Sequence, residues 1–213
     1  MTYNIRKFSI QDRADVRRLC CETAFLESDR GLIFKDDELL ADFLSLYFTD
    51  FEPHSCFVAT DGSKVVGYLI GSIHIPRMKR IIKRRILPSL LVKVFYRKAF
   101  LNKTNLNFFF RCVLGFFKGE FLVPDYSKEF PATLHINIDK SCRGQDIGGR
   151  LIEVYINFLK QQQIKGVQLS TFSEKAKNFF LKMGFDILYA RKRSYLKSVI
   201  AGEVTSYVFG KKL

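Results

Sequence analysis

Hydrophobic residues recur along this chain with two periods, one of about two residues and one of three to four. The shorter period predicts strands at 3–8, 56–60, 64–75, 133–138 and 167–172, with two more near 185–193 and 203–210. The longer period predicts amphipathic helices at 12–28, 36–47, 148–162 and 173–183. Asp61 and Gly62, between the second and third strands, favour a tight hairpin turn.

A glycine-rich turn follows the strand at 133–138 and leads into the helix at 148–162. It runs Arg143-Gly144-Gln145-Asp146-Ile147-Gly148-Gly149-Arg150. Glycines at a helix start expose a row of backbone N–H groups, and the positive end of the helix dipole adds to their attraction for phosphate. The pattern predicts a pyrophosphate-binding turn, with an ordinary strand-to-helix connection as the alternative interpretation.

This turn resembles the acetyl-CoA loop of the GCN5-related N-acetyltransferase (GNAT) family, Arg/Gln-x-x-Gly-x-Gly/Ala, with Arg143 first and Gly148 last. Asp146 stands where that family usually has glycine. A later segment, Ala-x-x-Phe-Phe-x-x-x-Gly-Phe from Ala176 to Phe185, resembles the family's second signature. The two segments occur in the family's order.

The resemblance implies an α/β (α+β) GNAT fold, a mixed and mostly antiparallel sheet with helices on both faces, in a single domain over 1–213. It implies an acyl-CoA-dependent N-acyltransferase that moves acetyl from its co-substrate acetyl-CoA to an amine of a small molecule or a protein. The strand backbone would pair with the pantetheine arm, and the turn would bind the pyrophosphate. The cofactor-binding residues so implied are Ile136, Ile138, Arg143, Gly144, Gln145, Asp146, Ile147, Gly148, Gly149, Arg150 and Ser173.

Two positions depart from the family's pattern. A carboxylate at Asp146 repels a pyrophosphate, by ~3 kcal/mol for unit charges ~5 Å apart at an effective dielectric constant near 20. Phe180 replaces the tyrosine that protonates the leaving thiolate in many members, so that water or a hydroxyl of Ser173, Tyr189 or Tyr195 would serve. The alternative function is therefore a catalytically degenerate GNAT-fold binding module that acts through its basic segment.

His135 is the candidate general base, because histidine titrates near neutral pH and lies on the strand that would line the cofactor cleft. Strand alternation places Thr133, His135 and Asn137 on one face. The segment 130–136 resembles a GNAT subgroup related to the acetyltransferase-like domain of O-GlcNAcases, with Asn137 where that pattern has aspartate. A histidine that only orders the strand is the alternative.

Positive charge is concentrated in one segment. Of the formal net charge of +14, 12 Lys or Arg and no Asp or Glu lie between residues 77 and 119, which leaves 14 − 12 = 2 for the rest. We call residues 76–130 the basic insert and expect helices in it, with a break or a new helix at Pro88. The apolar run at 106–117 is too short and too interrupted by Arg111 to span a bilayer.

Three roles of the basic insert stay open: a substrate lid, a peripheral contact with an anionic membrane or nucleic acid through 77–119, and a solvated face packed on the core. The five cysteines have no metal-ligand spacing, so we expect free thiols and no metal site. The chain enters a strand without a signal-peptide core, from which we expect a cytoplasmic protein with no transmembrane segment. Family members often pair through their last strands, so a homodimer is also expected.

Overall fold

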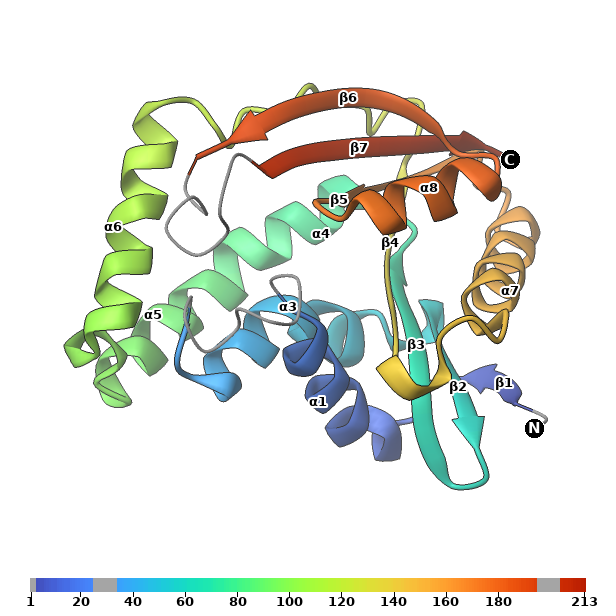
Figure 1. Ribbon diagram of the computed structural model, residues 1–213, viewed down its shortest axis with the longest axis horizontal. Coiled ribbons are helices and arrows are strands. Elements are labelled where there is room, and N and C mark those ends of the chain that lie inside the picture. Colours follow the sequence, from blue (N-terminus) through green and yellow to red (C-terminus); the bar gives the residue numbers. More distant parts are fainter. Residues whose placement is uncertain (1–2, 25–33, 195–203) are drawn as a thin grey trace.

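The computed structural model describes residues 3–24, 34–194 and 204–213 (Figure 1). These residues form a seven-stranded sheet in the order β1-β2-β3-β4-β5-β7-β6, in which β4 and β5 are parallel and every other neighbouring pair is antiparallel. The strands are β1 Asn4–Lys7, β2 Cys56–Asp61, β3 Lys64–Ser72, β4 Ala132–Ile138, β5 Gly166–Thr171, β6 Asp186–Arg193 and β7 Val204–Lys212. This is the mixed, mostly antiparallel sheet that the sequence predicted.

Helices cover both faces of the sheet, which confirms the predicted fold class. The two on one face are α1 Arg13–Thr23 and α3 Asp37–Phe51, and the two on the other are α7 Ile147–Gln161 and α8 Glu174–Lys182. The last residues of the helix predicted at 12–28 lie outside the described residues.

The central strands are buried on both faces. On β2, Val58 packs with the α1 residues Val16 and Leu19, whereas Phe57 packs with the α7 residue Tyr155. Successive side chains of a strand point to opposite faces, so a strand covered on both sides is apolar throughout. At the turn that follows, Gly62 has a φ of 58°, the left-handed conformation expected there.

The basic insert is largely helical in its first part. It contains α4 Ile75–Ile81, a π-helical turn Ile82–Ile86, α5 Leu87–Tyr96, a 3₁₀ turn Ala99–Leu101 and α6 Lys103–Phe117. Pro88 falls in the first turn of α5, and Leu87 N–H donates to the Ile82 carbonyl five residues back. The π-helical turn therefore lets the chain stay helical where the proline removes a donor.

The basic insert is tied to α3 at one end and to β6 at the other. Lys93 of α5 pairs with Asp42, and Arg97, which follows α5, pairs with Asp36. Further on, the Tyr126 hydroxyl donates to the Leu188 carbonyl at 3.0 Å. Figure 1 shows α6 and α5 at one end of the long axis and α7 at the other.

Candidate functional site

The parallel strands β4 and β5 diverge within the sheet. They pair with each other at Ala132 with Val167 and at Thr133 with Gln168. Beyond these pairs, β4 continues beside β3 as far as Ile138, and β5 continues beside β7. The backbones of β4 and β5 are therefore not paired with each other over the rest of their lengths, and we take this opening in the backbone pairing as the candidate site.

The backbone of β4 faces this opening at alternate residues. Asp139 N–H donates to the Val66 carbonyl at 2.8 Å, so the odd-numbered positions of β4 direct their N–H and C=O groups to β3. Ile136 and Ile138 consequently direct theirs toward β5. These are the two residues expected to pair with an extended pantetheine arm.

The turn between β4 and α7 ends in a left-handed backbone conformation. Gly144 has a φ of 79° and Asp146 one of 58°, so aspartate holds the strained position that glycine usually takes in this motif. The first helical hydrogen bond is donated by Arg150 to the Asp146 carbonyl at 3.2 Å. The backbone N–H groups of residues 147–149 lie before this first helical hydrogen bond, and the Asp146 side chain accepts no capping hydrogen bond from them. They are the donors available to an anion.

Side chains of the turn bind other parts of the fold. Arg143 Nε donates to the Ile138 carbonyl at 3.1 Å, at the end of β4. The Gln145 side-chain oxygen accepts from the hydroxyl of Tyr3 at 2.6 Å, and this attaches the turn to the segment before β1. Sequence reasoning missed Tyr3, because 142 positions separate the two residues.

Two glycines of the turn make room for neighbouring side chains. A Cβ on Gly148 would lie 3.2 Å from the Phe179 ring of α8. A Cβ on Gly149 would lie 2.6 Å from a carboxylate oxygen of Asp146. The Asp146 carboxylate therefore lies against the first turn of α7, close to where a bound anion would be expected.

Positions taken from the second signature have structural partners. Ser173 caps α8, its hydroxyl accepting from Ala176 N–H at 3.3 Å. Phe180 is buried in the core and packs on Phe185 and Phe209. Of the alternative hydroxyls, Tyr189 lies on β6, which β7 separates from β5, and Tyr195 lies outside the described residues.

His135 belongs to a polar network between β4, β3 and α1. Its Nε2 lies 2.9 Å from Asn137 Nδ2, which also donates to the Tyr68 hydroxyl at 2.7 Å. The Tyr68 hydroxyl in turn lies 2.8 Å from the Cys20 thiol. With the Asn137 amide donating to both neighbours, Nε2 accepts and the proton of the neutral imidazole is on Nδ1. Burial lowers the pKa of His135 to about 4, so the ring is uncharged at pH 7.

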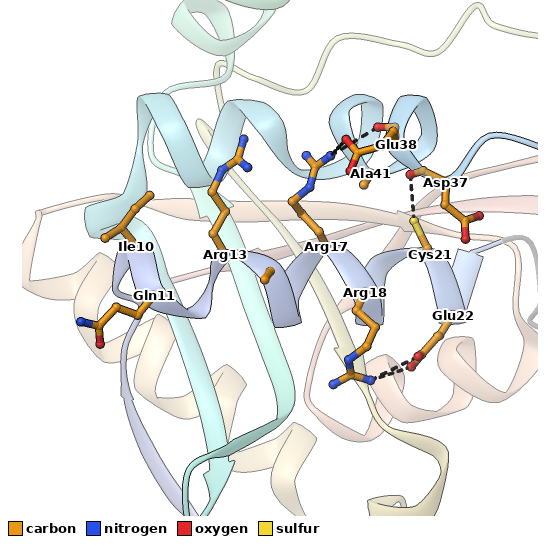
Figure 2. A pocket seen from close by; sticks show the side chains of 11 residues that line it. Ile10, Gln11, Arg13, Arg17, Arg18, Cys21, Glu22, Asp37, Glu38 and Ala41 are labelled. Atoms are coloured by element: carbon orange, nitrogen blue, oxygen red, sulfur yellow. Dashed lines mark hydrogen bonds and ion pairs between the residues drawn. The ribbon is translucent and has the colours of Figure 1, made fainter. Parts of the chain in front are cut away.

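A separate groove of about 680 Å³ lies between α1 and α3. Figure 2 shows Arg17 directed at Glu38 and Arg18 at Glu22, and these pairs are 2.5 and 3.0 Å long. None of the residues expected to bind cofactor lines this groove, nor does His135. All three arginines of its lining are engaged in ion pairs, Arg13 with Asp50 of α3 and the other two with Glu38 and Glu22, so it carries no functional assignment.

The described residues contain no group of three or more His, Cys, Asp or Glu that could hold a metal ion. Cys20, Cys21, Cys56, Cys112 and Cys142 are free thiols in the structure.

No protein-family model matches the sequence, and no curated protein matches it. Solved structures match across the whole chain. SsHAT has a TM-score of 0.72 and 22% identity over 100% of this chain and 98% of its own. The polyamine N-acetyltransferase of Drosophila melanogaster, which forms N-acetylagmatine, has a TM-score of 0.64 and 13% identity over 100% of both chains. An acetyltransferase of the GNAT family from Streptococcus pneumoniae has a TM-score of 0.54 and 18% identity over 100% of this chain and 99% of its own. The protein has the GNAT fold.

Proposed function

We propose that this protein is an N-acetyltransferase that uses acetyl-CoA and acetylates an amine. The observation that carries the proposal is the opening between the parallel strands β4 and β5, with the N-terminus of α7 at its end. An extended ligand arm can pair with the free edge of β4 while its phosphates meet the helix terminus. The named enzymes among the structural matches support an amine as acceptor.

The residues present fit CoA, with one exception. The backbone of Ile136 and Ile138 would hold the pantetheine arm, and N–H groups 147–149 would hold the pyrophosphate, with Arg143 and Arg150 exposed nearby. Ser173 would contribute to CoA binding from the N-terminus of α8. The exception is Asp146, whose negative charge lies against the same helix turn. Bound acetyl-CoA would supply an activated acyl thioester.

In this proposal His135 receives the proton of the acceptor amine. Its lowered pKa keeps the ring neutral at pH 7 and able to accept a proton, but makes it a weaker base than the histidine titrating near neutral pH that the sequence predicted. Its Nε2 must first leave Asn137, because the lone pair on that nitrogen already accepts a hydrogen bond. Water returns a proton to the departing thiolate, since buried Phe180 offers none.

The finer assignments belong to the same proposal. They are a single domain over 1–213, a cytoplasmic location, and a homodimer formed through the last strands. Within the GNAT fold, the motif at 130–136 supports a place near the subgroup related to the acetyltransferase-like domain of O-GlcNAcases.

The experiment combines a thermal shift with CoA and an assay of CoA release from acetyl-CoA over a panel of polyamines, amino sugars and peptides. We expect CoA to raise the melting temperature, because a ligand that binds only the native state stabilises it. We also expect at least one amine to release CoA, with a rate about 10²-fold lower in His135→Ala. No shift at millimolar CoA, in the wild type and in Asp146→Gly alike, would overturn the proposal.

The alternative is a GNAT-fold binding module without catalysis. The position of the Asp146 carboxylate and the burial of Phe180 favour it. The same experiment separates the two functions. A binding module would release no CoA with any amine, in the wild type and in His135→Ala alike.

A further inference from the structure

Large apolar side chains are exposed along α5 and α6 of the basic insert. Phe95 of α5 is 68% exposed, and Phe110 and Phe117 of α6 are 60% and 80% exposed. We call six of these residues the outer apolar face: Leu91, Phe95, Leu106, Phe110, Val113 and Phe117. Single exposed hydrophobic residues are common, but a gathering of this kind marks an interaction surface.

The spacing shows that this face is a continuous stripe on each helix. Leu91 and Phe95 are four residues apart on α5, and the α6 members follow at intervals of four, three and four. A different side of each helix packs against the fold, through Leu90 on α5 and through Phe108 and Phe109 on α6. Both helices therefore have an apolar stripe inward and a second one outward.

Five cations of the basic insert are neighbours of this face in the sequence. Lys83, Arg84 and Arg85 precede α5, Lys98 lies between α5 and α6, Lys103 begins α6, and all five are exposed. No acidic residue occurs from 77 to 119 to balance them. Lys93 and Arg97 differ, because they pair with Asp42 of α3 and with Asp36, the N-cap of α3.

We propose that the outer apolar face docks on an anionic lipid bilayer, with α5 and α6 lying in the interface and the cations at the headgroups. Phenylalanine and leucine on one surface with lysine and arginine at its margin are the composition that such helices use. No described helix has the length and apolarity to span a membrane, so the contact is peripheral. This inference goes beyond the proposed acetyltransferase function.

Charge favours a bilayer over a second copy of the chain. Joining two outer apolar faces would bring two sets of exposed cations together with no acid between them, which opposes association. Nucleic acid fits less well, because Leu91, Leu106 and Val113 cannot stack on bases. In Figure 1, α5 and α6 lie at the end of the molecule away from α7, so docking leaves the start of α7 free.

The test measures binding of the full chain to vesicles of phosphatidylcholine with and without phosphatidylglycerol. The variant replaces Phe95, Phe110 and Phe117 with serine, and the matched control replaces Ile10, Leu181 and Ile187, which are exposed elsewhere. We expect the wild type and the control to bind anionic vesicles and the variant to bind about tenfold or more weakly. All three should melt alike, because the replaced side chains are exposed.

A charge variant, Lys83, Arg84 and Arg85 each to Gln, gives an independent measurement. It should weaken binding to anionic vesicles, and added salt should weaken wild-type binding, because exposed charges are screened within ~10 Å at 0.1 M salt. The proposal would be overturned if the wild type bound no vesicles, or if the matched control lost as much vesicle binding as the phenylalanine variant. It would also be overturned if sedimentation showed a dimer that the phenylalanine variant dissociates and that vesicles do not affect. Binding to nucleic acid without binding to vesicles would also overturn it.

Discussion

At the scale of single residues, Asp146 fits the left-handed backbone conformation of the turn, but its negative charge opposes the binding of a phosphate there. Its φ of 58° suits Asn, Asp or Gly, and its carboxylate lies against the first turn of α7. A negative charge at a helix N-terminus competes with a bound phosphate for the same donors. The backbone role and the charge can therefore be separated by substitution.

We expect Asp146→Asn to tighten CoA binding by about tenfold, because it removes the charge while keeping a residue that tolerates the left-handed conformation. Isothermal titration with CoA measures the change. Asp146→Gly should give a similar gain, and Asp139→Asn, in the same connection, is the control that should leave affinity nearly unchanged. Weaker binding in Asp146→Asn would show that the carboxylate supports the site.

His135 links the candidate site to stability at acidic pH. Its pKa is about 4 in the folded protein because burial disfavours the charged ring, whereas an unfolded histidine titrates near 6.5. The unfolded state alone takes up this proton between those values, so stability is full above pH ~6.5 and falls as pH is lowered toward 4. At pH 5 the loss due to this group is at most about 2 kcal/mol.

Urea unfolding of the wild type and His135→Gln at pH 7.5 and pH 5 tests this prediction. The wild type should lose more free energy of unfolding between the two pH values than the variant does. An equal loss in both proteins would place the pKa of His135 near its usual value. The rate of acetyl transfer would then have an acid limb near pH 6.5 rather than near 4.

At the scale of elements, a buried carboxylate joins the end of α3 to β3. Glu52 is about 2% exposed and accepts hydrogen bonds from the Tyr47 hydroxyl, the Ser72 hydroxyl and Ile73 N–H at 2.6 to 2.7 Å. Burial, with the Glu52 carboxylate adding to it, raises the pKa of Tyr47 to about 12. Close by, the Tyr155 hydroxyl of α7 donates to the Thr133 carbonyl at 2.9 Å, where β4 and β5 begin to diverge.

Glu52→Gln should lower the free energy of unfolding by about 2–4 kcal/mol. Three donors face this carboxylate, and an amide would turn an N–H₂ group toward at least one of them. Chemical denaturation measures the loss. Glu153→Gln on the exposed side of α7 is the control, with an expected change within about 0.5 kcal/mol. A neutral Glu52→Gln would mean that the network rearranges without cost.

At the scale of the whole molecule, Asp42 holds three helices together. This α3 residue is 2% exposed and pairs with Arg17 of α1 and Lys93 of α5, each at 2.5 Å. Burial acts to raise the pKa of Asp42, but the hydrogen bonds from Lys93 and Arg17 outweigh it and hold the pKa below its ordinary value. The basic insert is thereby linked to the N-terminal helix through one carboxylate.

Asp42→Asn should cost about 3 kcal/mol near pH 7, because Arg17 and Lys93 lose their buried partner charge and Arg17 keeps only Glu38, whose side chain is 61% exposed. The difference from wild type should shrink as pH falls below about 4, where the depressed pKa of Asp42 makes its contribution disappear. Thermal and urea unfolding across this range check both parts. Asp50→Asn is the matched control on α3, since its pair with Arg13 is about one-third exposed and should contribute about 1 kcal/mol or less.

Local pattern was sufficient for the order and type of the strands and of the helices outside the basic insert, although the strand predicted at 64–75 ends at Ser72 and α4 begins at Ile75. The helix predicted at 148–162 is α7 at Ile147–Gln161, and the strand predicted at 133–138 is β4 at Ala132–Ile138. Periodicity works at this level because helix and strand place their apolar side chains at fixed intervals, whatever they pack against. The glycine-rich turn was found for the same reason, since its residues are contiguous.

The packed fold decided everything that depends on partners distant in sequence. The divergence of β4 from β5 follows from which neighbour each strand keeps, and Tyr3 meets Gln145 only after the sheet has formed. The same holds for the basic insert, where the helical period predicts an apolar side but not whether another element covers it. Among the residues that the structure describes, the inward stripes of α5 and α6 pack on other elements and the outward stripes are exposed, because the outcome depends on the surface that the remaining elements provide.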